Sequence, residues 1–218
     1  MNKNYDGRDY LLSESKYLKL DMPIPYDEMY KEAVALRGMF IPYRGDNATG
    51  WYSLPIVGKS ETEPYSWNVY YSSAKDAAPN MHFTKNSELC PITTKWLLET
   101  YPSNNYARVR FMLLEAGGVI NFHKDTEHSV LGAINIALNN PSGCAWHWKD
   151  GSSMEFKPGD IYAMNISYEH SIRNDSNEDR YHMIIHHYDS TERYKQLLIE
   201  AMEKYEVKGD FHFSTVLF

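Results

Sequence analysis

Residues 144–156 read CAWHWKDGSSMEF, and this stretch decides the fold. Trp146 and Trp148 alternate with His147, so the two tryptophans share one side of an extended strand, as core or as the wall of a binding site. Asp150-Gly151 then supplies the turn chemistry that closes β-hairpins, and residues 152–156 run back from it. The stretch therefore predicts two antiparallel strands joined by a tight turn.

The same alternation of strand and turn signals extends on both sides of this hairpin. From Tyr106 onward, apolar runs of five to eight residues alternate with clusters of Gly, Pro, Asn and Asp. Gly117-Gly118 ends the first of these runs, and Asn174 to Asn177 separates the last two. About seven short strands within roughly 80 residues predict a mainly β fold, a sandwich or a jelly roll. Besides the hairpin, the expected strands cover residues 108–114, 119–123, 129–138, 161–165, 170–173 and 180–187.

Helices are expected to flank this β region. Residues 27–39, 92–101 and 191–205 carry apolar side chains at helical spacing, and Pro102 ends the second of these helices. Between the first two, residues 45–86 are rich in Gly, Pro, Asn and Ser and suggest short strands and loops. Their aromatic cluster, residues 51–71, is either core or a lid over a site. We expect one domain over residues 1–218, with an irregular part (1–105), a jelly-roll core (106–188) and a C-terminal helix (190–206).

Composition excludes several classes of protein. The 218 residues hold 22 Lys and Arg against 29 Asp and Glu, a formal charge of −7, so no broad cationic surface is available for nucleic acid or anionic lipid. The two cysteines, Cys90 and Cys144, are too few for a disulfide scaffold. The polar first residues lack a signal peptide, and no apolar run is long enough to span a bilayer. We expect a cytoplasmic protein without a membrane or nucleic-acid partner; its oligomeric state stays open.

The chemistry is expected at His123-Lys124-Asp125. In an extended segment, residues two apart point to the same side, so an imidazole and a carboxylate can converge. His170, at the start of a predicted strand, would supply a second imidazole. Two His and one carboxylate form the facial triad of non-haem Fe(II) oxygenases. A His-x-Asp tripeptide alone is a weak signal, and its order with the surrounding turns strengthens it.

Arg180 follows His170 by ten residues and opens the run 180–187. Alternation places Arg180, His182 and Ile184 on one face of this strand. A buried guanidinium needs an anion, and a carboxylate offers it a bidentate partner. The alternative is an arginine at the rim of the sheet, paired with Asp179 or Glu178.

This order of residues resembles the aspartyl/asparaginyl β-hydroxylase family of Fe(II)/2-oxoglutarate-dependent dioxygenases, which also includes bacterial free-proline hydroxylases. The resemblance spans residues 108–187, and its motifs are Gly117-Gly118-x-Ile120-x-x-His123-x-Asp125 and the tract from His170 to Arg180. It implies a double-stranded β-helix, the jelly roll of cupins. It also implies that His123, Asp125 and His170 bind iron and that Arg180 holds the distal carboxylate of 2-oxoglutarate.

The second anchor of 2-oxoglutarate is open, because Asn135 stands about where some relatives place an Arg and a His. Arg110 falls where related enzymes have an arginine near the substrate or co-substrate, although an ion pair at the strand rim is an equal alternative. His128, three residues beyond Asp125, is expected in a loop and not as a ligand.

Three further groups have plainer interpretations. His182 either lines the pocket or is satisfied by backbone partners. His186 and His187 follow the apolar strand and are expected at the surface. Asp160 is expected to cap its own turn.

The resemblance implies hydroxylation of an unactivated C–H bond of an amino acid, peptide or protein side chain, with O2 consumed and succinate and CO2 released. An Arg such as Arg110 in a small pocket favours a carboxylate substrate, whereas an open groove favours a protein. Two alternatives stay open: a metal cupin isomerase or dioxygenase that does not use 2-oxoglutarate, and a jelly-roll binding module without catalysis.

Overall fold

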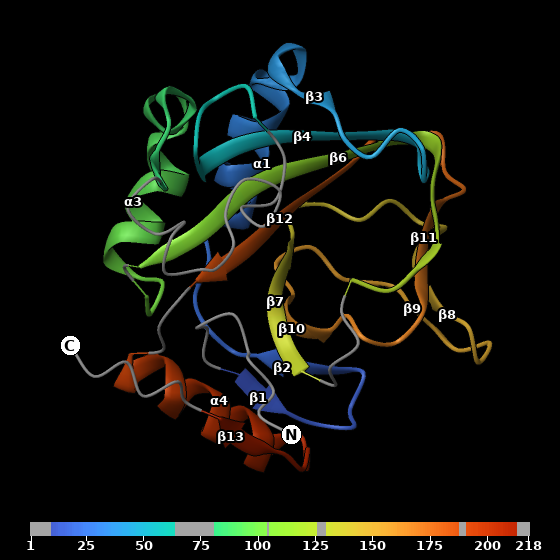
Figure 1. The fold of residues 1–218 in the computed structure, drawn as a ribbon. Coiled ribbons are helices and arrows are strands. Elements are labelled where there is room, and N and C mark those ends of the chain that lie inside the picture. The colour runs from blue at the N-terminus through green and yellow to red at the C-terminus, as the bar shows by residue number, and fades with distance from the viewer. Residues whose placement is uncertain (1–9, 64–80, 104, 126–129, 188–190, 213–218) are drawn as a thin grey trace.

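The computed structural model describes residues 10–63, 81–103, 105–125, 130–187 and 191–212 (Figure 1). Within these ranges thirteen strands form one curled antiparallel sheet, as the sequence predicted for a jelly roll. His128 and the predicted aromatic lid beyond residue 63 lie outside the described residues. The strands are β1 (Tyr10–Leu12), β2 (Tyr17–Leu20), β3 (Ile41–Pro42), β4 (Ala48–Gly58), β5 (His82–Phe83), β6 (Tyr106–His123), β7 (Val130–Ala137), β8 (Cys144–Trp148), β9 (Ser153–Met154), β10 (Ile161–Asn165), β11 (His170–Asn174), β12 (Arg180–His187) and β13 (Asp210–His212).

The path of hydrogen-bonded strands runs β13-β1-β7-β12-β6-β11-β8-β9. β10 joins it through β7 and β2, and β4 joins it through β6. β8 and β9 form the hairpin predicted around Asp150-Gly151, although β9 is only two residues long. Because strands far apart in sequence are neighbours, residues from β6, β7, β8, β11 and β12 all reach the interior of the curled sheet.

The strand β6 is longer than the sequence predicted. Gly117-Gly118 was expected to end a strand, but β6 continues to His123 with the backbone of Gly117 in the left-handed region (φ 73°). A Cβ on Gly118 would stand 2.7 Å from Cδ1 of Leu114, so the bend brings the backbone of Gly118 against the side chain of Leu114. Before the bend β6 pairs with β12, and after it with β11. The two glycines therefore make a corner between neighbouring strands of the sheet.

The first half of the chain is also more regular than predicted. Ala48 to Gly58 forms the eleven-residue strand β4, which pairs along β6 with a register shift on each side of its middle. Gly50 and Pro55 lie inside it. The expectation of only short strands and loops here was wrong, because turn-forming residues occupy bulges of a long strand.

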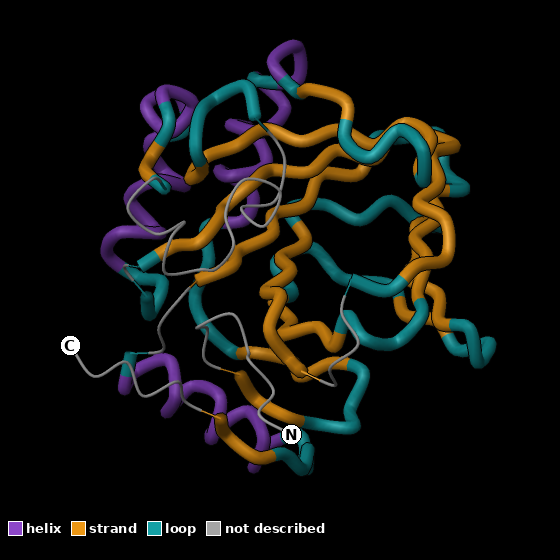
Figure 2. The backbone as a smooth tube through the Cα atoms, in the orientation of Figure 1, coloured by secondary structure: helices purple, strands orange, loops and turns teal. Residues whose placement is uncertain are grey.

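The three predicted helices are present as α1 (Tyr26–Ala35), α3 (Pro91–Glu99) and α4 (Glu192–Lys204). Short 3₁₀ turns, η1 (Arg37–Met39) and η4 (Lys85–Leu89), follow α1 and precede α3. Figure 2 shows the helices along the top, left and lower left of the view, while strands and loops make up the right side. In the described part of the chain, no helix is long and apolar enough to cross a membrane.

Two hydrophobic cores lie on opposite faces of the curled sheet. Alternation along β12 sends Tyr181, Met183 and Ile185 into the larger core, which α1, α3 and α4 cover. The smaller core fills the inside of the curl and is rich in aromatic rings. Its buried members are Leu114, Ile120, Ala137, Cys144, Trp146, Trp148, Phe156, Tyr162, Met164 and Ile172. Arg180 and His182 alternate along β12 with the residues of the larger core, so they face the inside of the curl.

Candidate metal centre

The pairing of β6 with β11 brings two histidines together. His123 ends β6 and His170 begins β11, and they are direct cross-strand partners. Their ring centroids are 4.4 Å apart. Asp125 follows two residues later, with its backbone N–H bonded to the carbonyl of Ile166 (3.0 Å). One ligand atom from each of the three side chains lies within 4.8 Å of the other two, so the predicted triad is assembled.

Both histidines are oriented by the same local hydrogen bond. Nδ1 of His123 donates to the carbonyl of Asn121, and Nδ1 of His170 donates to that of Tyr168, each at 2.8 Å. Nε2 of His123 lies 3.8 Å from Oδ2 of Asp125. A metal-binding histidine commonly donates its other ring nitrogen in this way, because the bond fixes the ring and its tautomer. The donor set thus fits a divalent cation of the first transition row.

Arg44 holds the carboxylate of the triad. Its Nη1 donates to Oδ1 of Asp125 at 2.8 Å, across 81 residues of sequence. Partial burial would raise the pKa of Asp125, but the charge of Arg44 and this hydrogen bond keep the pKa below its usual value. The carboxylate is therefore ionised at neutral pH, with Oδ2 turned toward His123.

The imidazole of His170 is neutral at neutral pH. Burial of its ring lowers the pKa to about 4, although the bond to Tyr168 opposes the shift. The ring of Trp146 stacks on it at 4.5 Å with planes 21° apart. A neutral imidazole offers its lone pair to a cation without first losing a proton. His170 is therefore ready to bind metal throughout the neutral pH range.

Arg180 is buried in the interior and is not at the rim. Its side chain contacts Asn140 through Nε (3.3 Å) and the ring of Phe156 (5.8 Å from Cζ to the centroid). Burial lowers its pKa. Among the described residues no carboxylate pairs with it, so the predicted rim ion pair with Asp179 or Glu178 is wrong.

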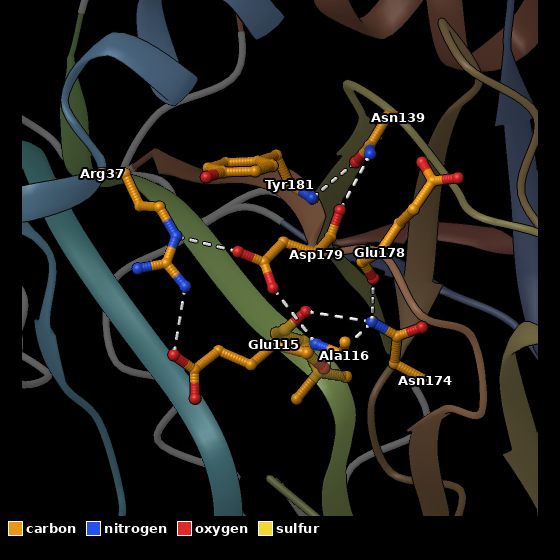
Figure 3. A network of polar contacts seen from close by, with 9 residues as sticks. Arg37, Glu115, Ala116, Asn139, Asn174, Glu178, Asp179 and Tyr181 are labelled. Atoms are coloured by element: carbon orange, nitrogen blue, oxygen red, sulfur yellow. Dashed lines mark hydrogen bonds and ion pairs between the residues drawn. The ribbon is translucent and has the colours of Figure 1, made fainter.

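Other groups bind the carboxylate of Asp179 and the backbone carbonyl of Glu178 (Figure 3). Arg37 binds Asp179 through Nε at 2.8 Å, and the second oxygen of Asp179 accepts from the backbone of Ala116. The amide of Asn174 donates to the carbonyls of Glu178, Leu114 and Glu115. This network fixes the turn between β11 and β12 and leaves Arg180 pointing the other way.

A chain of hydrogen bonds through His182 and Asn135 holds the guanidinium of Arg180 in place. Nη2 of Arg180 donates to Nδ1 of His182 (2.9 Å), and Nε2 of His182 donates to Oδ1 of Asn135 (2.8 Å). The amide nitrogen of Asn135 in turn donates to the carbonyl of Ala133. Burial, with the charge of Arg180, holds the pKa of His182 well below its usual value, so this ring is neutral. His182 therefore faces the interior with side-chain partners and not with backbone partners.

Aromatic rings connect the triad with Arg180. Trp146 stacks on His170 and lies parallel to Phe156, with centroids 6.3 Å apart. Phe156 in turn contacts His182 (5.5 Å between centroids) and Arg180. The interior thus has a metal-binding end and a cationic end, and a wall of rings runs between them.

Arg110 lies elsewhere in the interior, with a buried side chain. Its Cζ is 4.8 Å from the ring centroid of Tyr43. Burial would raise the pKa of Tyr43, but the charges of Arg110, Arg108 and Arg44 lower it to about 8. Sequence reasoning missed Tyr43 and Arg44, because they follow the two-residue strand β3 and no motif marks them.

Of the remaining predictions, the one for Asp160 is confirmed and those for His186 and His187 are wrong. Asp160 caps its turn as expected, accepting from the backbone of Lys157 at 2.7 Å. His186 and His187 were expected at the surface, but only 7% and 8% of their area is exposed. Arg108 contacts His186 at 3.0 Å. Helix α4 covers His187, whose ring meets that of Tyr194 edge-on at 4.5 Å. β12 therefore stays buried to its last residue.

In the comparison with protein families, the family described as aspartyl/asparaginyl beta-hydroxylase matches residues 41–189, which include every member of the triad and Arg180. The comparison with curated proteins gives no match.

Solved structures are similar to this chain to different degrees. A prolyl hydroxylase from Trichoplax adhaerens, solved with a peptide of hypoxia inducible factor, aligns over 84% of this chain and 87% of its own, with 10% identity and a TM-score of 0.50. A prolyl-4-hydroxylase from Pseudomonas putida aligns over 80% and 94%, with 13% identity and a TM-score of 0.44. A cupin domain from Bordetella pertussis covers 39% of this chain and 84% of its own, with 17% identity and a TM-score of 0.32.

Proposed function

Since this chain belongs to the aspartyl/asparaginyl β-hydroxylase family, we propose that it hydroxylates an unactivated C–H bond of an amino acid, peptide or protein side chain. Its cofactors are Fe(II) and 2-oxoglutarate. With these and dioxygen bound, one oxygen atom enters the substrate and the other enters succinate, while the 1-carboxyl group of 2-oxoglutarate leaves as CO2. The observation that carries the proposal is the triad His123, Asp125 and His170 beside the buried Arg180.

The triad would hold iron through three atoms. Nε2 of each histidine is free of the backbone bond that occupies Nδ1, and Oδ2 of Asp125 is free of Arg44. With only three protein ligands, a cation held there would keep open positions for co-substrate and dioxygen. The chain's own contribution at this end is to orient the ligands and keep them in the right protonation state.

Arg180 would bind the distal carboxylate of 2-oxoglutarate. A guanidinium so deeply buried is costly without an anion, and a carboxylate matches its planar fork. His182 and Asn135 fix the orientation of the fork, and both ring nitrogens of His182 are already used, so Asn135 acts through His182. Burial among aromatic rings keeps this end dry, which strengthens the ion pair.

The substrate would enter beside the metal from the side of Tyr43 and Arg110. Both side chains are buried, and the positive charge of Arg110 faces the interior from β6. A guanidinium in this position favours a substrate that carries a carboxylate close to the reacting carbon. Free amino acids and acidic or C-terminal peptide groups are the first compounds to test.

A turnover assay tests the proposed function. Protein loaded with Fe(II) is incubated with 2-oxoglutarate, O2 and a panel of amino acids and peptides, and succinate is measured together with the mass of each substrate. We expect succinate release coupled to a gain of 16 Da in one substrate. Arg180→Ala should reduce succinate release by at least 100-fold at subsaturating 2-oxoglutarate, because a buried charged contact is lost.

Arg173→Ala is the matched control, since Arg173 lies on β11, the strand that precedes β12 in the sequence, and pairs at the surface with Asp175. It should leave turnover unchanged. Substrate conversion that does not need 2-oxoglutarate would instead support a metal cupin of another reaction class. Absence of any metal binding would support a binding module.

A further inference from the structure

The indole of Trp146 has a buried donor without an acceptor. Only 6% of the residue is exposed, and among the described residues nothing accepts a hydrogen bond from its Nε1–H. A buried N–H without a partner costs about as much as a lost hydrogen bond, so such groups usually meet a bound ligand or water. We propose that Trp146 donates this N–H to a carboxylate oxygen of 2-oxoglutarate, as the second anchor beside Arg180. The inference rests on the proposed function.

The position of Trp146 selects this ligand. Its ring stacks on the metal ligand His170 at 4.5 Å and lies parallel to Phe156, which in turn contacts Arg180. A dicarboxylate bound at one end by the metal and at the other by Arg180 spans the same interval. The indole of Trp146 therefore lies between the two ends at which the co-substrate would be bound.

The other polar groups near Arg180 are already committed. Both ring nitrogens of His182 are used, one by Arg180 and one by Asn135, and the amide nitrogen of Asn135 is used by Ala133. His182 cannot donate to a ligand without breaking a buried bond, and one of the two amide hydrogens of Asn135 is held by Ala133. Trp146 can donate its N–H at no such cost, which makes it an available second donor.

Trp148 provides a matched control on the same strand. It is equally buried, and its indole N–H also lacks a partner among the described residues. Its ring lies 6.3 Å from that of Trp146, but it stacks on Tyr17 (5.8 Å between centroids) under the ammonium group of Lys16 and not on His170. The same substitution at the two tryptophans therefore separates loss of a donor near Arg180 from loss of a buried indole in general.

The test measures binding of 2-oxoglutarate by calorimetry to Fe(II)-loaded protein without oxygen. Trp146→Phe keeps a ring against His170 but removes the donor, and we expect the dissociation constant of 2-oxoglutarate to rise about tenfold. Trp148→Phe should leave it within twofold of the wild type. The affinity for Fe(II) should stay within twofold in both variants, which shows that the triad is intact.

A second variant guards against misfolding of the first. Incorporation of benzothienylalanine at position 146 replaces the N–H by sulfur and preserves the shape of the indole, so it should produce the same loss of affinity. If wild-type protein binds 2-oxoglutarate and both changes at Trp146 leave its affinity within twofold, this inference is overturned alone. If the Fe(II)-loaded wild type does not bind 2-oxoglutarate, the proposed function falls and the inference falls with it.

Discussion

A single hydrogen bond to the backbone fixes the tautomer and the ring orientation of each histidine in the triad. Donation from Nδ1 to a carbonyl two residues earlier holds the ring against its own strand, so the lone pair of Nε2 must point away from the backbone. Arg44 does the same for Asp125 by engaging Oδ1. Three residues thus offer one atom each, with orientation set by groups that do not touch the metal.

The state of His170 predicts how stability depends on pH. Burial sets its pKa at about 4 in the folded protein, against about 6.5 in the unfolded chain. As the pH falls below about 6.5 the unfolded chain takes up the proton first, so stability is full above that pH and declines toward pH 4. At pH 5 the metal-free protein should be about 2 kcal/mol less stable than at pH 7 on account of His170.

Urea denaturation at the two pH values measures this difference. His170→Asn should reduce the loss by roughly that amount, because asparagine does not titrate. A variant that keeps the whole pH dependence of the wild type would refute the assignment to His170.

At the scale of elements, β6 links the outer core with the interior. Val109, Phe111 and Leu113 face the helices, while Arg108 and Arg110 alternate with them into the curl. Beyond the corner at Gly117-Gly118 the same strand carries His123 to its place opposite His170. The position of the metal ligand therefore depends on a close bend six residues before it.

Substitution of Gly118 tests the corner. A methyl group there would stand 2.7 Å from Cδ1 of Leu114 and 2.8 Å from the carbonyl oxygen of Glu115. Gly118→Ala should therefore reduce the free energy of unfolding by about 1–3 kcal/mol, since the backbone carbonyl cannot move aside cheaply. Gly45→Ala is the control, because a Cβ at that position meets nothing within 4 Å. Equal midpoints of urea denaturation for both variants would show that the bend tolerates a side chain.

The turn between β11 and β12 is tested at Asn174. Its amide nitrogen donates to three carbonyl oxygens, and the side chain is fully buried. Asn174→Ala should destabilise the protein by about 2 kcal/mol and weaken binding of 2-oxoglutarate, because Arg180 begins the strand that follows this turn. Asp175→Ala, at the exposed next position, should change neither quantity. Unaltered denaturation of the Asn174 variant would contradict the role given to the network.

Local chemistry made some elements predictable and others not. The first residues of β8, β10 and β12 come directly after turn residues, so the starts of these strands could be predicted. β4 could not, because Gly50 and Pro55 signal turns when read locally and become bulges only beside β6. The full length of β6 could not be predicted for the same reason, since Gly117-Gly118 is compatible either with the end of a strand or with a bend inside one.

Over the whole molecule, the candidate site was predictable only where it follows strand periodicity. His123 and Asp125 lie two residues apart, and Arg180 shares a face with His182, so spacing placed them correctly. Tyr43 and Arg44 reach the interior from a turn that tertiary packing alone brings to β6. His186 and His187 were misplaced because the spacing does not show that the following helix, α4, returns over His187 or that Arg108 of β6 contacts His186.

Metal binding should stabilise the molecule as a whole. A cation that binds only the folded state adds about 2.7 kcal/mol at 100 times its dissociation constant, which corresponds to a rise of about 5–10 °C in Tm for a chain of this size. Thermal unfolding with Fe(II) under argon measures it. His123→Ala should abolish the rise, whereas Lys149→Ala, an exposed substitution near the triad, should retain it. A shift of equal size in the His123 variant would place the metal elsewhere.

The direct pairing of His123 with His170 across neighbouring strands has a kinetic consequence. Their separation is set by the spacing of the sheet, so the apoprotein already holds the two imidazoles next to each other, with their ring centroids 4.4 Å apart. Loading then involves stripping water from the ion and a slight rotation of side chains, with no segment left to fold around it. Uptake should therefore follow a single exponential whose rate rises linearly with ion concentration, and release into a chelator should leave the amide exchange of β6 and β11 unaltered.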